Sequence, residues 1–171
     1  STGMRGVFKM IWVGIDPGKD GAIVALNESG VQTVPILLRK CVQKRKWNIR
    51  RVLDAFAIFA KMNPELVVIE KPIAMPRQSV KSTFETGYGF GILVTAMESH
   101  NIEYEVVPVR EWQANVLVGT DKKGKERAIE VAHAIVPELE FCGPSKHSGI
   151  ADAACLAIHA RNQWNVRQSK Q

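Results

Sequence analysis

The sequence contains few cysteines, and no two of them lie close together. Cys41, Cys142 and Cys155 are the only three, and they form no Cys-X-X-Cys motif. An odd count without that spacing predicts neither a disulfide framework nor a zinc knuckle. We therefore expect a reducing compartment and a fold that is stabilised by its hydrophobic core.

Long apolar stretches are also missing. The longest apolar runs fall far short of the roughly 20 residues that a membrane-spanning helix needs. The opening residues STGMRGVFKM lack the apolar segment of a secretory signal. We therefore expect neither a membrane partner nor secretion. Since no repeat, low-complexity tract or linker divides the chain, residues 1–171 are expected to form one domain, with a core from about residue 10 to residue 161 and flexible termini.

The residues that are present suit one core and carry an excess of positive charge. Of the 171 residues, 46% are hydrophobic, which is enough for a single domain without staples. Lys and Arg number 23 against 17 Asp and Glu, so the formal net charge is +6. This balance favours a polyanionic partner such as nucleic acid, although many small proteins are basic without one.

The spacing of apolar residues predicts a mixed α/β fold. Segments 10–16, 21–27 and 30–36 predict an antiparallel meander. After a basic loop, helical spacing predicts a helix that Asn48 caps and that ends at Pro64, with Ile49, Val52, Leu53, Phe56 and Ala60 at helical spacing. The segment ELVVIE, 65–70, predicts a central strand buried on both faces. The remaining expected elements are helices over 78–99, 110–117, 125–136 and 148–161 and a strand over 103–108. This order predicts a mixed sheet flanked by helices.

Three carboxylates stand where this fold would bring them together. Asp16 follows the first strand and Glu70 ends the central strand. If these strands are parallel neighbours joined by a right-handed crossover, their C-terminal ends meet. Asp152 begins an Ala-rich helix with one apolar side, where an unpaired carboxylate is costly to bury. Each acid also has a plain structural explanation, because Asp-Pro-Gly suits a tight turn and acids favour first helical turns.

Carboxylates at neighbouring strand ends repel each other unless a cation separates them. The set offers oxygen donors, with no cysteine ligands and no His pair beside them. Such a donor set favours the hard divalent cations Mg²⁺ and Mn²⁺ over zinc.

Three segments resemble the motifs of one enzyme family. VGIDPGKDGAIV, LVVIEKP and KHSGIADAACLAIHA, in order between about residues 11 and 161, are similar to motifs of RuvC-like Holliday junction resolvases, in the RNase H-like superfamily and particularly its short phage and organelle branches. The resemblance implies an RNase H-like mixed five-stranded sheet flanked by helices. It implies that Asp16, Glu70 and Asp152 are metal ligands and that two Mg²⁺ ions, replaceable by Mn²⁺, serve phosphodiester cleavage.

The same resemblance implies a partner and a location. The partner would be branched DNA, a four-way junction, which a homodimer nicks symmetrically during recombination and repair. The expected location is the cytoplasm or nucleoid of a bacterium or phage host, or an organelle if a transit peptide has been removed.

One position departs from the family's pattern. The family adds a fourth ligand, Asp or sometimes His, shortly before the last acid, where this chain has His147 and Ser148. Three explanations stay open: His147 supplies the ligand, Ser148 binds weakly or through water, or the site is impaired. Both residues are therefore candidate catalytic residues, while a helix cap at Ser148 and a surface position for His147 are the structural alternatives.

Basic and loop residues are the candidate DNA contacts. Two basic runs precede predicted helices and are placed to flank the acids, although surface lysines often only solvate a face. The resemblance adds the loop after Glu70, which would enter the junction, and assigns the helix with Gly87 and Gly91, whose stripe of small residues permits close approach, to the dimer interface. The candidate DNA-binding residues are Lys40, Lys44, Arg45, Lys46, Ile73, Met75, Arg77, Lys81, Lys122, Lys123 and Lys125.

Three other functions compete with a junction resolvase. Ser148 motivates a junction-binding protein with an impaired site, and other RNase H-like nucleases share the acid geometry. An actin-like sugar kinase or ATPase also has a phosphate loop similar to GIDPG, but it needs a second domain and a second acidic motif that this chain lacks. We therefore expect no nucleotide cofactor and a structure-selective, divalent-metal-dependent endodeoxyribonuclease.

Overall fold

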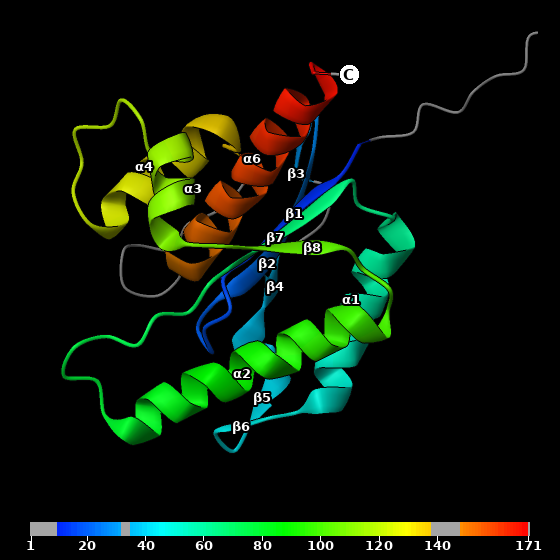
Figure 1. The fold of residues 1–171 in the computed structure, drawn as a ribbon, viewed down its shortest axis with the longest axis vertical. Coiled ribbons are helices and arrows are strands. Elements are labelled where there is room, and N and C mark those ends of the chain that lie inside the picture. Colours follow the sequence, from blue (N-terminus) through cyan, green and yellow to red (C-terminus); the bar gives the residue numbers. More distant parts are fainter. Residues whose placement is uncertain (1–9, 32–34, 138–147, 171) are drawn as a thin grey trace, which may run out of the picture.

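The computed structural model describes residues 10–31, 35–137 and 148–170. A mixed sheet forms its centre, with the strand order β3-β2-β1-β7-β8, and β4 also pairs with β2 (Figure 1). Because β3 and β4 both run antiparallel along β2, on the edge away from β1, they share one position and the sheet is five strands wide. The strands are β1 (Trp12–Ile15), β2 (Ala22–Asn27), β3 (Gly30–Val31), β4 (Ile36–Leu37), β7 (Leu66–Glu70) and β8 (Tyr104–Val107).

The predicted meander and the predicted central strand are both confirmed. β1 pairs antiparallel with β2 and parallel with β7, which in turn pairs parallel with β8. The third strand of the meander is divided into β3 and β4, and residues 32–34 between them lie outside the described residues.

Helices cover both faces of the sheet and bury a separate core on each (Figure 1). Alternate residues of the central strands point to opposite faces, so Trp12 and Val68 join one core while Val13 and Val67 join the other. The helices α1 (Ile49–Met62) and α2 (Val80–Ser99) lie on one face, and α3 (Val109–Val116), α4 (Lys125–Ile135) and α6 (Ser148–Gln168) lie on the other. None of the described helices is long and apolar enough to cross a membrane.

The basic segment before α1 is more ordered than the predicted loop. It forms a 3₁₀ helix, η1 (Leu38–Cys41), and a hairpin of β5 (Val42–Gln43) and β6 (Lys46–Trp47). Lys44 and Arg45 make the turn with φ of 46° and 65°. This is the left-handed backbone that two-residue hairpin turns require, and Asn or Gly usually marks it. The expectation of a loop was wrong because neither residue is present here.

The predicted cap of α1 is confirmed, but its predicted apolar face is only partly correct. The Asn48 side chain accepts a hydrogen bond from the Arg51 N–H at 3.2 Å. Val52 and Phe56 are buried, whereas Ile49 is 52% exposed. Ile49 begins the helix and lines an open groove between α1 and α2, where no element of the described ranges covers it.

The last helix differs most from its prediction. It continues to Gln168, beyond the expected core boundary at 161, and residues 149–160 are buried all round except at Asp152. The expectation of one apolar side was wrong because the sheet, α3 and α4 surround this part of α6 together.

α6 lies against β1 at very short distance because Gly14 has no side chain. A Cβ atom at Gly14 would collide with the Ala153 carbonyl oxygen and the Ala157 backbone nitrogen. At the start of α6, Gly149 forms a bridge with Gly21. These contacts place the first turns of α6, with Asp152, on the end of β1.

In α2, the glycine that permits close packing is Gly89 and not the expected Gly87 or Gly91. Among the residues that the structure describes, a Cβ at Gly87 or Gly91 would meet nothing within 4 Å, so none of these residues makes the predicted close approach. A Cβ at Gly89 would lie 2.8 Å from Nε1 of Trp47. Gly89 therefore lets the hairpin pack on α2.

We predict that Gly14→Ala destabilises the domain. The new methyl group must displace the backbone of α6, and overpacking typically costs about 1–3 kcal/mol. Gly18→Ala is the matched control, because its Cβ would be 3.7 Å from the nearest atom, in ordinary contact. Urea unfolding measures both variants, and wild-type stability of Gly14→Ala would contradict the close packing of α6 on β1.

Candidate active site

Parallel pairing of β1 and β7 brings Asp16 and Glu70 side by side. Ile15 pairs with Ile69, so the next residue of each strand stands at the same edge of the sheet. The structure thus juxtaposes the two carboxyl groups as expected from the strand order. Burial raises the pKa of the Glu70 carboxyl, and the charge of Asp16 raises it further, while a hydrogen bond from Trp112 opposes the rise.

The turn after β1 accounts for how Asp16 is held. Its side chain accepts a hydrogen bond from the Gly18 N–H at 3.2 Å, and its backbone N–H bonds to the Ala22 carbonyl at 3.0 Å. Asp16 is therefore both a turn residue and a member of the acidic cluster. Burial raises the pKa of its carboxyl, whereas the Gly18 N–H and the charge of Lys125 act in the opposite direction.

Asp152 lies close to both of these acids and comes from α6. Burial raises the pKa of its carboxyl to about 7, and the charges of Asp16 and Glu70 contribute to the rise. This mutual influence shows that three acids far apart in the sequence form one electrostatic cluster, which we call the carboxylate cluster.

Two residues beside the carboxylate cluster have roles that the sequence did not indicate. Lys125, expected only as a phosphate contact, begins α4 and its charge lowers the pKa of both Asp16 and Asp152. Trp112 of α3 donates from Nε1 to Oε2 of Glu70 at 2.7 Å. Its helical spacing with Val116 marks a core residue, and no local pattern in the sequence reveals that its N–H meets an acid.

The candidates for a fourth ligand are only partly described. His147 lies outside the described residues, and Ser148 begins α6 but its side chain is not described. Whether His147 or Ser148 completes the cluster, or the site is impaired, therefore stays a prediction. Cys142 also lies outside the described residues, while Cys41 and Cys155 are free and buried.

Five of the predicted DNA contacts lie in two loops, one before α2 and one before α4. The loop before α2 and the loop before α4 project on the left of Figure 1, below and above the sheet. Ile73 and Met75 in the first loop are 54% and 64% exposed, and Arg77 is exposed as well. Lys122 and Lys123 are exposed in the second loop. The neighbouring Arg127 is instead turned inward and bonds the Leu117 carbonyl at 3.0 Å.

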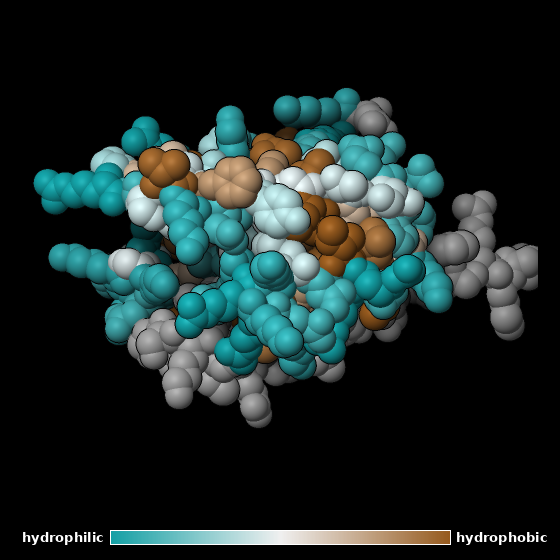
Figure 2. Space-filling model, turned by 90° about the horizontal axis from the view of Figure 1, so that it is seen from below, coloured by the Kyte–Doolittle hydropathy of each residue, from teal (hydrophilic) through white to brown (hydrophobic). Residues whose placement is uncertain are grey.

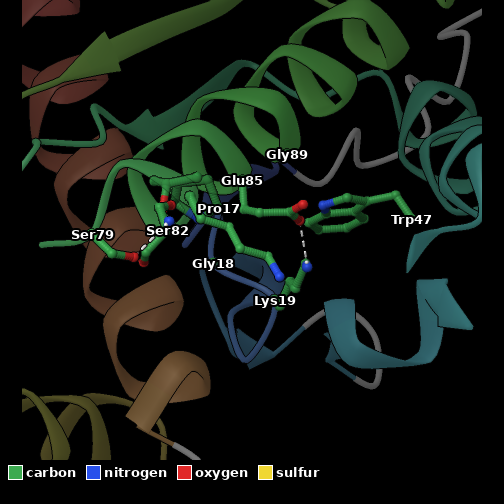
Figure 3. Close-up of a pocket in the computed structure, with 10 residues that line it drawn as sticks. Pro17, Gly18, Lys19, Trp47, Ser79, Ser82, Glu85 and Gly89 are labelled. Carbon is green, nitrogen blue, oxygen red and sulfur yellow. Dashed lines mark hydrogen bonds and ion pairs between the residues drawn. The ribbon is translucent and has the colours of Figure 1, made fainter. Parts of the chain in front are cut away.

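The basic hairpin is tied to the turn that follows Asp16. Lys40, Lys44, Arg45 and Lys46 are all exposed on η1 and the hairpin. Lys19 donates from Nζ to the Arg45 carbonyl at 3.1 Å. The same Nζ donates to Oε2 of Glu85 on α2 at 2.8 Å (Figure 3). Lys19 and Lys81 line a pocket of ≈ 390 Å³ together with Trp47 and hydroxyl groups of α2 (Figure 3).

The three acids supply only oxygen donors, which are the ligands that Mg²⁺ prefers. Asp16, Glu70 and Asp152 are partly buried oxygen donors, and burial raises the pKa of all three carboxyl groups. Within the described ranges, no group of three or more His, Cys, Asp or Glu side chains is arranged to hold a metal ion by itself. Mg²⁺ typically binds only one or two carboxylates and completes its coordination with waters and substrate phosphates, so the chemistry of these donors, rather than a preformed three-ligand geometry, is what suits Mg²⁺.

Two solved structures have a similar fold over nearly the whole chain. T. thermophilus RuvC in complex with Holliday junction substrate matches with a TM-score of 0.64 and 15% identity, over 93% of this chain and 96% of that chain. A second Thermus thermophilus RuvC structure matches with a TM-score of 0.63 and 16% identity, over 94% and 97%. No family model and no curated protein matches the sequence. The RuvC-like, RNase H-like fold expected from the motifs is thus confirmed, and at this identity the similarity shows the fold alone.

We predict that Asp152→Asn raises the melting temperature in EDTA at pH 8. Because the folded-state pKa is raised to about 7, the folded protein binds more protons than the unfolded chain between about pH 4 and 7, so stability falls as pH rises through this window. Removing the charge should raise the melting temperature by a few degrees, since 1 kcal/mol corresponds to about 2–4 °C at this size.

The gain should shrink as the pH falls towards 4, where Asp152 of the wild type is protonated. Asp54→Asn removes the same charge from an exposed position on α1 and is the control. Scanning fluorimetry across pH checks both variants, and an equal gain at pH 4 and pH 8 would contradict the buried charge.

Proposed function

We propose that this protein is a divalent-metal-dependent endodeoxyribonuclease that resolves four-way (Holliday) DNA junctions by paired, symmetric nicks. The observation that carries the proposal is the carboxylate cluster, in which Asp16, Glu70 and Asp152 from separate elements meet at one sheet edge in a RuvC-like fold. A similarly folded protein, T. thermophilus RuvC, has been solved with a Holliday junction substrate, which supports branched DNA as the partner.

The proposed cofactors are Mg²⁺ ions, two per site, with Mn²⁺ as a substitute. Asp16, Glu70 and Asp152 would hold them together with water and phosphate oxygens. When bound, such ions activate a water and stabilise the leaving 3′-oxygen.

The chain's own residues prepare this site in distinct ways. The Gly18 N–H fixes one oxygen of Asp16, and the Trp112 N–H fixes one oxygen of Glu70. Lys125 adds positive charge beside the cluster, which lowers the repulsion that an incoming phosphate would meet. The basic loops on both sides would bind the backbone of the junction arms without reading sequence.

The face formed by α1 and α2 supports the proposed homodimer. Figure 2 shows apolar side chains among hydrophilic ones on this face. Val80, Phe84 and Tyr88 follow each other along α2 and are 87%, 70% and 50% exposed, and the rings of Phe84 and Tyr88 stack at 6.3 Å. An apolar groove beside them is lined by Ile49, Leu53 and Ile92, among others. A second copy packed here through a twofold axis would match the symmetry of a four-way junction.

A junction-binding protein without cleavage is the second candidate. Ser148 occupies a position where the resembled family has an acid. Binding of a labelled junction with no nicking in either Mg²⁺ or Mn²⁺ would favour this candidate, and restoration of cleavage by Ser148→Asp would identify the cause.

We predict that Glu70→Gln and Asp16→Asn abolish junction cleavage but keep junction binding in EDTA. Each change removes a carboxylate charge with almost no change of shape. Loss of a metal ligand should lower the cleavage rate by more than the roughly 10–100-fold that is typical when a hydrogen-bond partner of a ligand is lost. Glu65→Gln, an exposed carboxylate at the opposite end of β7, is the control. The assay compares a labelled four-way junction with a linear duplex, and undiminished cleavage by both cluster variants would refute the metal site.

We predict that Lys44→Asn combined with Arg45→Asn weakens junction binding and its salt dependence. Asn tolerates the left-handed turn, so the hairpin should keep its shape while losing two charges. Each lost phosphate contact lowers the slope of log affinity against log salt by about 0.9. Lys61→Gln, at the end of α1 away from the cluster, is the control for charge. An unchanged slope would exclude the hairpin from the DNA interface.

A further inference from the structure

Trp112 is a buried side chain that donates a hydrogen bond to the carboxylate cluster. It is 1% exposed and packs in the core that the sheet forms with α3, α4 and α6. From this position its Nε1 donates to Oε2 of Glu70 at 2.7 Å. The direction of the N–H is thus set by packing of the whole ring.

α3, the helix that carries Trp112, is fixed to two other elements. It begins at Val109 immediately after β8, and the Lys71 N–H bonds the Val107 carbonyl at 2.9 Å, which continues the pairing of β7 with β8. On its other side, Oδ1 of Asn115 lies 3.1 Å from Nδ1 of His159 and accepts from Nδ2 of Asn162 at 3.1 Å. Both partners belong to α6, the helix that carries Asp152. The position of the Trp112 ring therefore depends on the strands and on α6 together.

The chemistry of the indole suits the orientation of an anion that must stay charged. An indole N–H only donates and carries no charge, so it occupies one carboxylate oxygen without neutralising the group, as Lys or Arg would. A Glu side chain at a strand end otherwise has several rotamers, and a fixed partner removes most of that freedom.

We propose that Trp112 is a positioning residue that holds one oxygen of Glu70 so that the other is presented to a divalent cation. This inference rests on the proposed function, because it assigns Glu70 as a ligand. It adds a residue outside the acidic motifs to the machinery of the site, and it makes α3 the element that couples Glu70 to α6.

Trp12 provides a matched control in the same core. It lies on β1, is also 1% exposed, and packs in the same cluster as Trp112. Its Nε1 has no hydrogen-bond partner among the described residues. Trp12→Phe and Trp112→Phe therefore remove similar buried area, but only Trp112→Phe removes a hydrogen bond to the carboxylate cluster.

The experiment compares wild type, Trp112→Phe, Trp12→Phe and Glu70→Gln in three measurements. These are Mn²⁺ binding by calorimetry without DNA, single-turnover junction cleavage at saturating enzyme, and junction affinity in EDTA. Because loss of an outer partner of a metal ligand typically costs about 10–100-fold, we expect Trp112→Phe to weaken Mn²⁺ binding and slow cleavage by that factor. Trp12→Phe should leave both close to wild type, and junction affinity in EDTA should be the same for all.

A Trp112→Phe variant that matches Trp12→Phe in Mn²⁺ affinity and cleavage rate would overturn the inference. Absence of Glu70-dependent Mn²⁺ binding in the wild type would overturn it too. Wild type that binds Mn²⁺ through Glu70 but leaves junctions intact would instead refute the proposed function, and the Mn²⁺ comparison of the two Trp variants would still decide the role of Trp112.

A measurement on the wild type covers the case in which Trp112→Phe does not fold. The indole N–H resonance of Trp112 should shift when Mg²⁺ is added and should move in Glu70→Gln, whereas that of Trp12 should do neither. An indole resonance of Trp112 that responds to neither change would overturn the inference.

Discussion

The close packing of α6 on β1 is the constraint on which the rest of the structure depends. Gly14 leaves room for the backbone of α6 at Ala153 and Ala157, and Gly149 meets Gly21 at the start of the helix. Since the helix is buried almost all round from residue 149 to 160, the apolar area that it removes from water stabilises this placement. The same placement forces Asp152 next to Asp16 and Glu70, so the core holds together three charges that repel each other.

That repulsion gives the carboxylate cluster its chemical character. A cluster built only for stability would pair each acid with a cation, whereas here burial raises the pKa of all three acids, and neighbouring carboxylates of the cluster raise those of Glu70 and Asp152 further. Lys125 and the N–H groups of Gly18 and Trp112 oppose the rise without cancelling it. The excess negative charge at one edge of an otherwise basic protein is what supports the proposal of divalent cations there, with DNA phosphates completing their coordination.

The basic hairpin is connected to the carboxylate cluster through Lys19. Lys19, three residues after Asp16, joins the hairpin to α2 through Arg45 and Glu85. The exposed ion pair itself contributes little to stability. The role of Lys19 is geometric, because its contacts hold the hairpin with Lys44 and Arg45 in a fixed position relative to the turn that contains Asp16.

Because hydrophobic periodicity and turn residues are local signals, they were sufficient to predict the pairing of the strands around Glu70, the cap at Asn48 and the three acids. The hairpin at Lys44 and Arg45, the burial of α6 on all sides and the exposure of Ile49 and Gly91 could not be predicted in this way, since each depends on which elements pack nearby. The contact of Trp112 with Glu70 likewise depends on how the elements pack. The two residues are 42 positions apart, and a hydrogen bond across that distance exists only once β7, α3 and α6 share one core.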